Sequence, residues 1–429
     1  MLKVGFSRVD ITPPLGTRIE GYFEERHMKG ILDPLYLNAL AFSDGEKTVL
    51  LIAADVIHIK KKYADEIKSF ISEKVGIPAD SIMVTALHQH TSFGLRDLDT
   101  KNAVKDKSFM ESLYRKFADL SQMAIDDMAE AEAETAEKET SEQLSFIRRY
   151  VMTDGTVMTY PASRRREIVR PCRESDNMVR FVRFKREKGD IALVNFSTHP
   201  DVIHGEYVSA DWPGFVRAFV ERDIEGVHCV ATVGAQGDSN HMEFMAEEYK
   251  DGYEHSKHMG RVIADTVISM WDKTEKRSTE GLNIHKKDVF IRTRTDGEEK
   301  YEEMKKLIAD YNAGTYVGPK LNITDLGTAT RIVNIKTAPL YQQIPVTVIN
   351  LGEIGLAGYG GEPFTSYADA LREAYPERFI MTSCCANGGE GYLPTKEAFH
   401  EIGYEAGSSP FSENLEEECV KTAIEMLNR

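Results

Sequence analysis

Hydrophobic and polar positions follow two different periods along the chain. Short apolar runs rich in β-branched residues, typical of buried strands, occupy residues 48–57, 81–87 and 227–233. Segments with apolar residues at i, i+3 and i+4 spacing, such as residues 63–75, predict amphipathic helices. Because the two kinds alternate as far as a last helix at residues 416–427, the pattern predicts an α/β fold with a large mixed β-sheet and flanking helices.

Two predicted hairpins argue against a purely parallel sheet. Residues 144–158 form one hairpin that turns at Asp154-Gly155, a dipeptide that hairpin turns prefer. Residues 178–185 and 191–197 form a second strand pair around Lys188-Gly189-Asp190. The sheet is therefore expected to contain both parallel and antiparallel neighbours.

Two long helices and one charged segment complete the expected organisation. The helices are predicted over residues 109–133 and 253–271. Residues from about 293 to 338 are highly charged and weakly patterned, with a helix expected at 298–311. Since no internal repeat or low-complexity linker interrupts the chain, we interpret residues 1–429 as one catalytic domain that carries this helical insertion.

Charge and composition restrict the expected partners. The chain has 53 Lys and Arg against 69 Asp and Glu, a formal net charge of −16, whereas nucleic acids and anionic membranes need clustered cations. No apolar run approaches the roughly 18 residues that cross a bilayer. The five cysteines are scattered without CxxC spacing. We therefore expect a cytoplasmic protein with a small-molecule substrate, no nucleic acid and no stable membrane association; a homo-oligomer stays open.

Histidines follow two of the predicted strands, where α/β folds place their ligands. His88 and His90 come directly after the strand at 81–87, and side chains two residues apart on extended backbone point to the same side. His199 follows the strand at 191–197. Either the three imidazoles converge on one point, or they are loop residues with ordinary hydrogen bonds.

Three glycine-bearing turns hold further candidates. Ser239 lies in a turn whose small residues let the backbone approach a ligand, and as a nucleophile it would need a base nearby. Glu362 stands before a helix-starting proline, where a carboxylate either favours the helix N-terminus or serves as a ligand. Tyr392 lies on a glycine-rich loop after the strand at 379–385. Two imidazoles and a carboxylate make a good zinc set if they meet.

The order of these motifs resembles the zinc-dependent catalytic domain of the neutral, non-lysosomal ceramidase family. The matching segments, which span nearly the whole chain, are residues 4–14, Gly21-Tyr22, Ala54-Asp55, His88-Gln89-His90, His199, residues 237–240, residues 361–364, residues 391–395 and Tyr404-Glu405. Two departures stand out. The turn that begins at Gly237 is shorter and lacks the family's proline, and the chain ends at Arg429 without room for the C-terminal immunoglobulin-like domain of ceramidases.

The resemblance implies a role for each candidate residue. The four implied zinc ligands are His88, His199, Glu362 and Tyr392. The four implied catalytic residues are His90, Tyr404, Arg149 and Ser239. His90 would lie beside the metal-bound water and carry protons, since an imidazole titrates near working pH. Tyr404 would polarise the scissile carbonyl, Arg149 would point into the pocket, and Ser239 would correspond to the family's reactive serine.

The implied function is zinc-dependent hydrolysis of the amide bond of a small N-acyl compound by an activated water. Two alternatives stay open. A glycoside or ester would use the same water, and a polar pocket lined by Arg149, Asp211 and Asp238 would suit polyols. A non-catalytic binding protein on the same fold is the other alternative.

Overall fold

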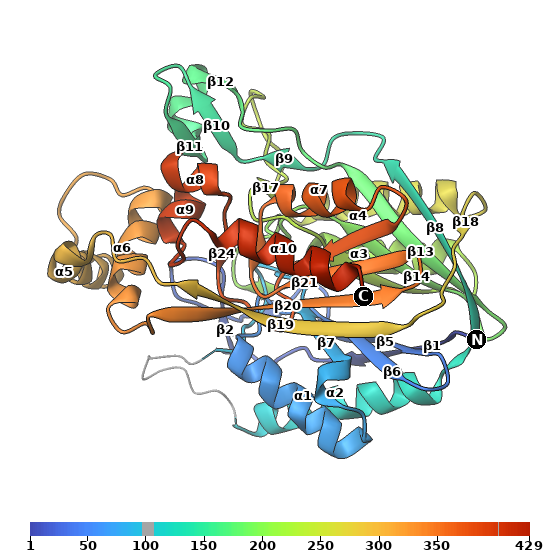
Figure 1. The fold of residues 1–429 in the computed structure, drawn as a ribbon. Helices are drawn as coiled ribbons and strands as arrows, with labels where there is room; N and C mark the ends of the chain where they lie inside the picture. The colour runs from blue at the N-terminus through green and yellow to red at the C-terminus, as the bar shows by residue number, and fades with distance from the viewer. Residues whose placement is uncertain (97–106, 402) are drawn as a thin grey trace.

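The computed structural model describes residues 1–96, 107–401 and 403–429 and has the predicted α/β architecture (Figure 1). Its largest sheet is mixed, with parallel pairing only between β14 and β16 and between β6 and β7. In spatial order its strands are β16 (His228–Val233), β14 (Ile191–Phe196), β13 (Met178–Arg186), β8 (Ala129–Glu139), β1 (Lys3–Asp10), β5 (Tyr36–Ser43), β6 (Thr48–Ala54) and β7 (Ile82–Ala86), and β18 (Glu275–Lys276) pairs with β8.

A second sheet packs against the first, and the sequence pattern did not separate the two. Its strands, in order, are β19 (Asn283–Arg292), β20 (Tyr341–Leu351), β21 (Ile354–Tyr359) and β23 (Phe379–Ser383). In β20, Val346 and Val348 face the core under α7 (Thr365–Ala374) and α10 (Leu415–Leu427), whereas Ile349 and Leu351 join the core of the large sheet. Burial on both faces explains why β20 is a nearly continuous hydrophobic run.

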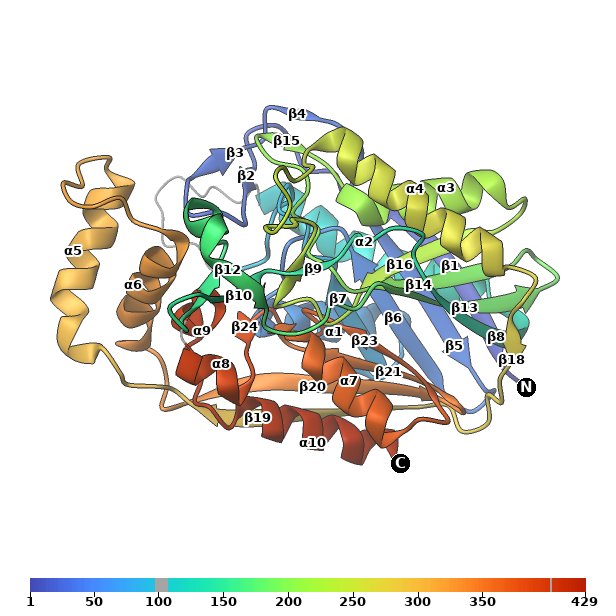
Figure 2. The ribbon, with the colours of Figure 1, turned by 90° about the horizontal axis from the view of Figure 1, so that it is seen from above.

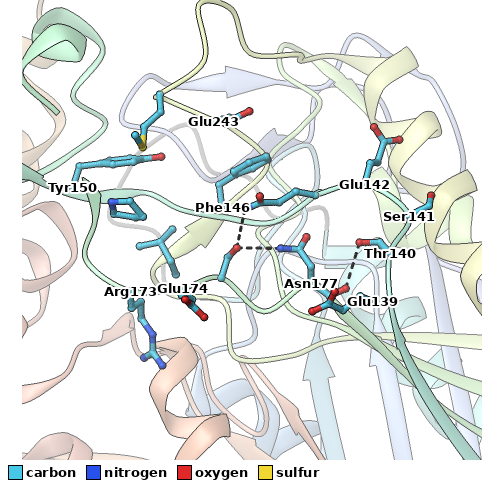
Figure 3. A pocket seen from close by; sticks show the side chains of 15 residues that line it. Glu139, Thr140, Ser141, Glu142, Phe146, Tyr150, Arg173, Glu174, Asn177 and Glu243 are labelled. Atoms are coloured by element: carbon cyan, nitrogen blue, oxygen red, sulfur yellow. Dashed lines mark hydrogen bonds between the residues drawn. The ribbon is translucent and has the colours of Figure 1, made fainter. Parts of the chain in front are cut away.

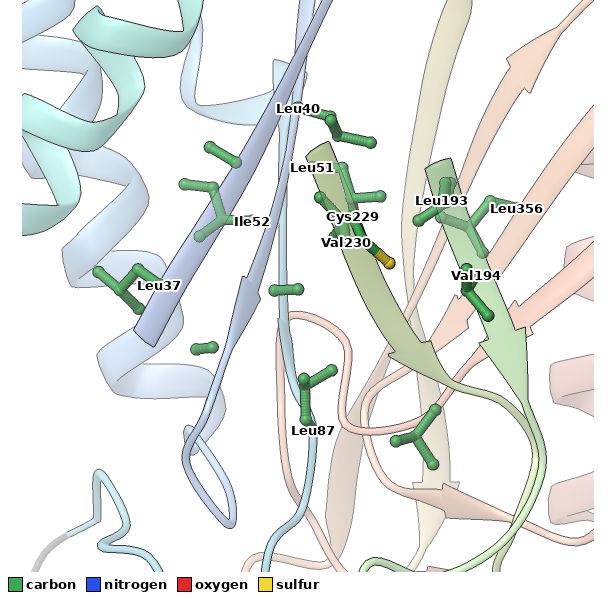
Figure 4. Close-up of a cluster of buried hydrophobic side chains, with 14 of the residues drawn as sticks. Leu37, Leu40, Leu51, Ile52, Leu87, Leu193, Val194, Cys229, Val230 and Leu356 are labelled. Carbon is green, nitrogen blue, oxygen red and sulfur yellow. The ribbon is translucent and has the colours of Figure 1, made fainter. Parts of the chain in front are cut away.

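The large sheet curls so that its end strand β16 lies near the interior strand β1. The Phe6 ring in β1 stacks on His228 in β16 at 4.4 Å, and Arg8 donates to Glu221 and to the Cys229 carbonyl. Figure 4 shows side chains from both halves in one cluster, among them Leu40, Leu51, Leu193 and Val230. This curl brings the C-terminal ends of β7, β14 and β16 toward one region.

Helices cover the outside of this sheet (Figure 2). α2 (Lys107–Asp126) packs on β1 and β5 beside α1 (Lys61–Val75), and α3 (Asp211–Asp223) and α4 (Tyr253–Met270) pack near β16 and β8. The prediction of a helix over residues 109–133 was wrong in its last part, because α2 ends at Asp126. Residues 129–139 form β8 instead, in which buried Ala131 and Ala133 alternate with exposed glutamates, the period of a strand.

Both predicted hairpins are confirmed, the first over a shorter span. β10 (Arg149–Met152) pairs with β11 (Val157–Thr159) around the Asp154-Gly155 turn, and β13 pairs with β14. The remaining strands are β12 (Ile168–Pro171), which pairs with β10, and the two-residue pairs β2 (Arg18–Ile19) with β3 (Arg26–His27), β4 (Gly30–Ile31) with β15 (Tyr207–Val208), β9 (Phe146–Ile147) with β17 (Ser239–Asn240) and β22 (Glu362–Pro363) with β24 (Tyr392–Leu393). Short 3₁₀ segments lie at Ala79–Ser81, Ala162–Glu167, which kinks at Arg164, and Glu298–Lys300.

The charged segment at residues 293–338 joins β19 to β20 and stands at one end of the molecule (Figure 1). Its predicted helix is α5 (Tyr301–Asn312), which follows a 3₁₀ turn. A second helix, α6 (Ile323–Ile335), packs on α9 (Tyr404–Ser408), which follows α8 (Lys396–Glu401). α6 starts with a capping box between Asn322 and Asp325, a start signal that the sequence already carried.

In the part of the chain that the structure describes, we find no helix with the length and apolar character that crossing a bilayer demands.

Candidate metal centre

Three histidines from two parts of the chain, His88 and His90 after β7 and His199 after β14, meet in one buried group. Their ring centroids are 5.0 Å apart for His88 and His90, 5.2 Å for His88 and His199, and 5.8 Å for His90 and His199. One ring nitrogen from each lies within 4.8 Å of the others, and each side chain is buried. Such a group has the spacing and donor atoms that hold a metal ion.

The local route to this convergence differs from the predicted extended backbone. His88 has φ of +70°, a left-handed conformation that is uncommon outside glycine. The turn arises because the chain leaving β7 continues to bond the loop after β6: Leu87 N donates to Ala54 O at 2.9 Å, and His88 N to Val56 O at 3.0 Å. His90 then returns to the same side as His88, so the rings meet although the simple alternation does not apply.

Backbone carbonyls fix the orientation of two of the imidazoles. Nδ1 of His88 lies 2.7 Å from the Ile57 carbonyl, and Nδ1 of His199 lies 2.8 Å from the Gln236 carbonyl. Since a carbonyl only accepts, Nδ1 carries the proton in each ring, and the Nε2 atoms face Glu362 Oε2 at 3.2 and 3.1 Å. A neutral imidazole nitrogen and a carboxylate oxygen are both acceptors, so this contact requires a proton or a cation between them.

A short parallel pair positions the carboxylate and the phenol. Glu362 in β22 faces Tyr392 in β24, and Glu362 N donates to the Gly391 carbonyl at 2.9 Å. The Tyr392 ring lies 6.3 Å from the His199 ring. Behind this pair, a Cβ at Gly237 would lie 2.3 Å from the Glu362 carbonyl oxygen. Gly237 therefore lets two backbone segments of the protein pack closely behind Glu362. The sequence had suggested that this turn allows close approach to a ligand.

The charges of this group are strongly coupled. Burial opposes protonation of His88, but the carboxylate of Glu362 outweighs it and raises the pKa of His88 to about 9. Burial and the nearby Arg148 guanidinium lower the pKa of His199 to about 4. Burial would raise the pKa of Glu362, but the two imidazoles hold it well below its usual range. For His90, burial and the charges of its two histidine neighbours lower the pKa well below the ordinary value. A concentrated set of shifts of this kind is typical of functional sites.

The arginine beside Tyr392 is Arg148, whereas the sequence pointed to Arg149. The Arg148 guanidinium carbon lies 5.2 Å from the centre of the Tyr392 ring. Arg149 instead donates to Glu401 at 2.9 Å and to Glu405 at 3.2 Å. Successive residues of an extended chain point in opposite directions, so only one of two adjacent arginines reaches the site. Glu405, fully buried, also accepts from Arg148 Nε at 2.8 Å and holds both guanidinium groups.

Tyr404 lies at the edge of the group, and Ser239 lies behind it. The Tyr404 ring packs edge-on against Tyr392 at 5.4 Å, and burial raises the pKa of its hydroxyl. The Ser239 hydroxyl contacts only backbone carbonyls, at 3.4 Å, among the described hydrogen bonds. Its own carbonyl lies 2.9 Å from His199 Nδ1. The backbone of Ser239 thus orients a histidine, and its hydroxyl faces carbonyls instead of the base that a nucleophile needs.

His90 has neighbours that the sequence reasoning missed. Neither ring nitrogen of His90 has a hydrogen-bond partner within the described residues, and Nδ1 lies 3.3 Å from Asp201 Oδ1. The Tyr22 ring packs against His90 at 5.4 Å, and its hydroxyl contacts both Asp201 and His204. A Cβ at Gly21, where φ is +113°, would lie 2.8 Å from His90 Nδ1. Asp201 stands two residues after His199, but nothing in the sequence distinguishes it from other carboxylates.

A buried ion pair supports the loop between the two neighbouring histidines. Asp55 accepts from Gln89 Nε2 at 2.9 Å and from Arg217 at 3.0 and 2.6 Å, and both members of the ion pair are buried. Gln89 separates His88 from His90 in sequence. Asp55 thereby ties the end of β6 to the histidine loop.

The three residues expected to line a polyol pocket are occupied elsewhere. Asp211 Oδ2 accepts from the backbone N–H groups of Val202 and Ile203 at 3.0 and 3.1 Å. Asp238 accepts from Thr365 N at 2.8 Å, at the start of α7. Both carboxylates are buried and Arg149 is ion-paired, so the three present no common polar surface. A cavity of about 560 Å³ near Glu139 and Asn177 (Figure 3) also contains none of the eight candidate residues.

The comparisons with known proteins agree with the predicted fold. No family model matches the chain, and no curated protein matches it in sequence. Among solved structures, a neutral ceramidase from Pseudomonas aeruginosa aligns with a TM-score of 0.75 and 14% identity, over 99% of this chain and 74% of that one. A ceramidase complexed with C2 aligns with a TM-score of 0.75 and 13% identity over the same shares. At such identity the similarity establishes a neutral-ceramidase-like fold and nothing finer.

Proposed function

We propose that this protein is a zinc-dependent hydrolase that cleaves the amide bond of a small N-acyl compound. The observation that carries the proposal is the position of Glu362 Oε2, 3.2 Å from His88 Nε2 and 3.1 Å from His199 Nε2, with Tyr392 beside them. Imidazole nitrogens with a carboxylate suit zinc. The two ceramidases that share this fold support an amide as the substrate class.

The surroundings of these residues fit a bound cation. Carbonyls hold the Nδ1 protons of His88 and His199, the outer arrangement that orients imidazole ligands. The buried nitrogens of His90 have no hydrogen-bond partner within the described chain. When bound by His88, His199, Glu362 and Tyr392, zinc would acidify a water toward neutral pH and polarise a carbonyl.

The chain's own residues have separate tasks in this reaction. Water adds to the carbonyl carbon, so a C–O bond forms and the C–N bond breaks, and one water proton ends on the leaving amine. We assign that proton transfer to His90, whose ring lies 5.0 Å from the His88 ring. We assign to the Tyr404 hydroxyl the donation of a hydrogen bond to the carbonyl oxygen. Arg148 holds the Tyr392 ring in position.

Metal analysis and a substrate panel test the proposal together. Purified protein should hold about one zinc per chain, and His199→Ala should lose it. N-acyl compounds should be hydrolysed in preference to glycosides and esters. Absence of zinc with no activity on adding it, or turnover of a glycoside while every amide fails, would contradict the proposal. If the protein is a binding protein without chemistry, His88→Ala should leave its biological role intact.

A further inference from the structure

Two cavities have lining residues that belong to or contact the candidate metal centre. One, of about 620 Å³, is called the apolar cavity below; the other, of about 400 Å³, is called the charged cavity. Consecutive residues separate them: Tyr22 and Gly403 line the apolar cavity, and Phe23 and Tyr404 line the charged cavity. Residues 22–23 and 403–404 therefore form a wall, called the divide, with one cavity on each side.

This divide lies directly over the candidate site. Tyr22, on the apolar side, packs against His90 at 5.4 Å. Tyr404, on the charged side, packs against Tyr392 at 5.4 Å, and Tyr392 itself lines the charged cavity. A carbonyl group bound at this centre would have one half of its molecule in each cavity.

Part of the lining of the apolar cavity is hydrophobic, as an acyl chain needs, beside polar residues that include Asp201, His204 and Asp325. Its hydrophobic side chains come from the β10–β11 hairpin region, the loop after β17 and the start of α6. They are Val157, Met158, Met242, Phe244 and Ile323. Its volume lies within the range of pockets that enclose small ligands.

The charged cavity has three cations and one carboxylate in its lining: Lys60, Arg96, Arg331 and Glu390. Lys60 Nζ lies 3.5 Å from Glu390 Oε2, which is long for an ion pair. The other oxygen of Glu390 accepts a hydrogen bond from the Lys61 backbone N–H at 2.9 Å. The side chains of Lys60 and Arg96 are 34% and 37% exposed. Both cations can therefore reach a ligand in the cavity.

Nearby carboxylates leave this cavity with a positive excess. Arg96 pairs with Glu20 at 2.6 Å, and Arg331 pairs with Asp296 at 3.1 Å, but Asp296 is shared with Arg294. Within the described residues, the three lining cations and Arg294, which does not line the cavity, thus meet three carboxylates when Glu390 is included. In a chain with a net charge of −16, a concave region of opposite sign concentrates anionic ligands.

We propose that the substrate is an N-acylated amino acid, in which the acyl chain occupies the apolar cavity and the carboxylate of the amine half lies near Lys60 and Arg96. This inference rests on the proposed amide hydrolysis and adds the substrate class. α6 contributes Ile323 to one cavity and Arg331 to the other. The charged segment at residues 293–338 is therefore the outer wall for both halves of the substrate.

Two substrates that differ in charge at one end test the amine half. With zinc-loaded protein, kcat/KM for N-dodecanoylglycine should exceed that for N-dodecanoylethanolamine by about tenfold or more, the effect of one charged contact. Lys60→Gln should reduce that ratio toward one. Lys62→Gln, at an exposed position of α1, is the matched control and should keep the ratio. Arg96→Gln is a second test of the same ratio, but this variant also loses the ion pair with Glu20.

The acyl half is tested by filling its cavity. Met242→Trp should lower kcat/KM for the dodecanoyl substrate relative to N-acetylglycine by about tenfold, since the added ring takes the volume that the chain needs. Met245→Trp, which lines the separate cavity of Figure 3, should not change that ratio.

The outcomes separate the two proposals. Amide hydrolysis with no charge preference, or with a preference that Lys60→Gln leaves intact, would overturn the substrate class and keep the hydrolase. If no amide is hydrolysed, the hydrolase proposal fails, and calorimetry with N-dodecanoylglycine decides the cavity assignment. Binding weakened about tenfold by Lys60→Gln would support it, and equal binding of the ethanolamide would overturn it.

Discussion

Glu362 and Tyr392 face each other across the two-residue parallel pair of β22 and β24, so one backbone register places a carboxylate and a phenol side by side. The register leaves both side chains on the side of His199. The pairing makes Tyr392 part of the candidate metal set although 29 residues of chain separate it from Glu362.

Tyr392→Phe should weaken zinc binding by about tenfold or more, because it removes one oxygen donor and leaves the ring packing in place. Competition with a chelator of known affinity measures the change. Tyr404→Phe is the control, since Tyr404 lies one ring further out: it should lower activity but keep the zinc affinity within about threefold. Equal zinc affinity in the Tyr392 variant and the parent protein would remove Tyr392 from the ligand set.

Asp55→Ala should destabilise the fold by about 3–5 kcal/mol, since it leaves the buried Arg217 guanidinium without its carboxylate. Urea unfolding gives the free energy. Asp272→Ala, at a side chain that is 92% exposed, should change it by less than about 0.5 kcal/mol. A similar loss in both variants would contradict a structural role for the Asp55 pair.

Arg148→Met should lower kcat/KM at least about tenfold more than Arg149→Met. Both variants lose an ion pair with Glu405, but only Arg148 lies over the Tyr392 ring. Comparing the two variants by kinetics and by thermal unfolding separates catalysis from stability. Equal kinetic losses would mean that the arginines act only through Glu405.

The stability of the protein should fall in acid partly through Asp65. Burial raises the pKa of Asp65, but hydrogen bonds from Lys61 and Lys68 outweigh it and lower the pKa to about 2. A carboxyl whose folded pKa is depressed stabilises the fold above its unfolded pKa near 4, and that contribution is lost as the pH falls toward 2.

Asp65→Asn should therefore lower the free energy of unfolding by about 1 kcal/mol at pH 7. This value is reduced because the Asp65 side chain is 40% exposed. The difference between parent and variant should shrink between about pH 4 and pH 2. Urea unfolding at a series of pH values measures it. A difference that stays constant down to pH 2 would show that the charge of Asp65 contributes nothing.

The fold class and most elements could be predicted because local periodicity records burial on one face or both. The error at residues 129–133 came from extending the apolar helix face past its end at Asp126, although alanine and glutamate alternate there with the period of a strand. The second sheet could not be separated from the first, because both faces of β20 are buried against different layers and the sequence shows only a hydrophobic run.

For the site, residue types at strand ends made the histidines, Glu362 and Tyr392 candidates, and the resemblance to neutral ceramidases implied which four would bind zinc. Their contacts depend on long-range packing. The left-handed turn at His88 and the choice between Arg148 and Arg149 depend on backbone geometry that the sequence does not state. Asp201 and Asp55 were missed as supporting residues, because a carboxylate acting through another side chain has no spacing of its own.

The central claim is that His88, His199, Glu362 and Tyr392 bind one metal ion. A crystal structure of the zinc-loaded protein with anomalous scattering collected at the zinc edge tests it most directly. The account predicts one strong peak at about 2.0–2.3 Å from Nε2 of both histidines, a Glu362 oxygen and the Tyr392 oxygen. A fully loaded protein whose peak lies elsewhere, or whose four side chains bind no ion, would contradict it.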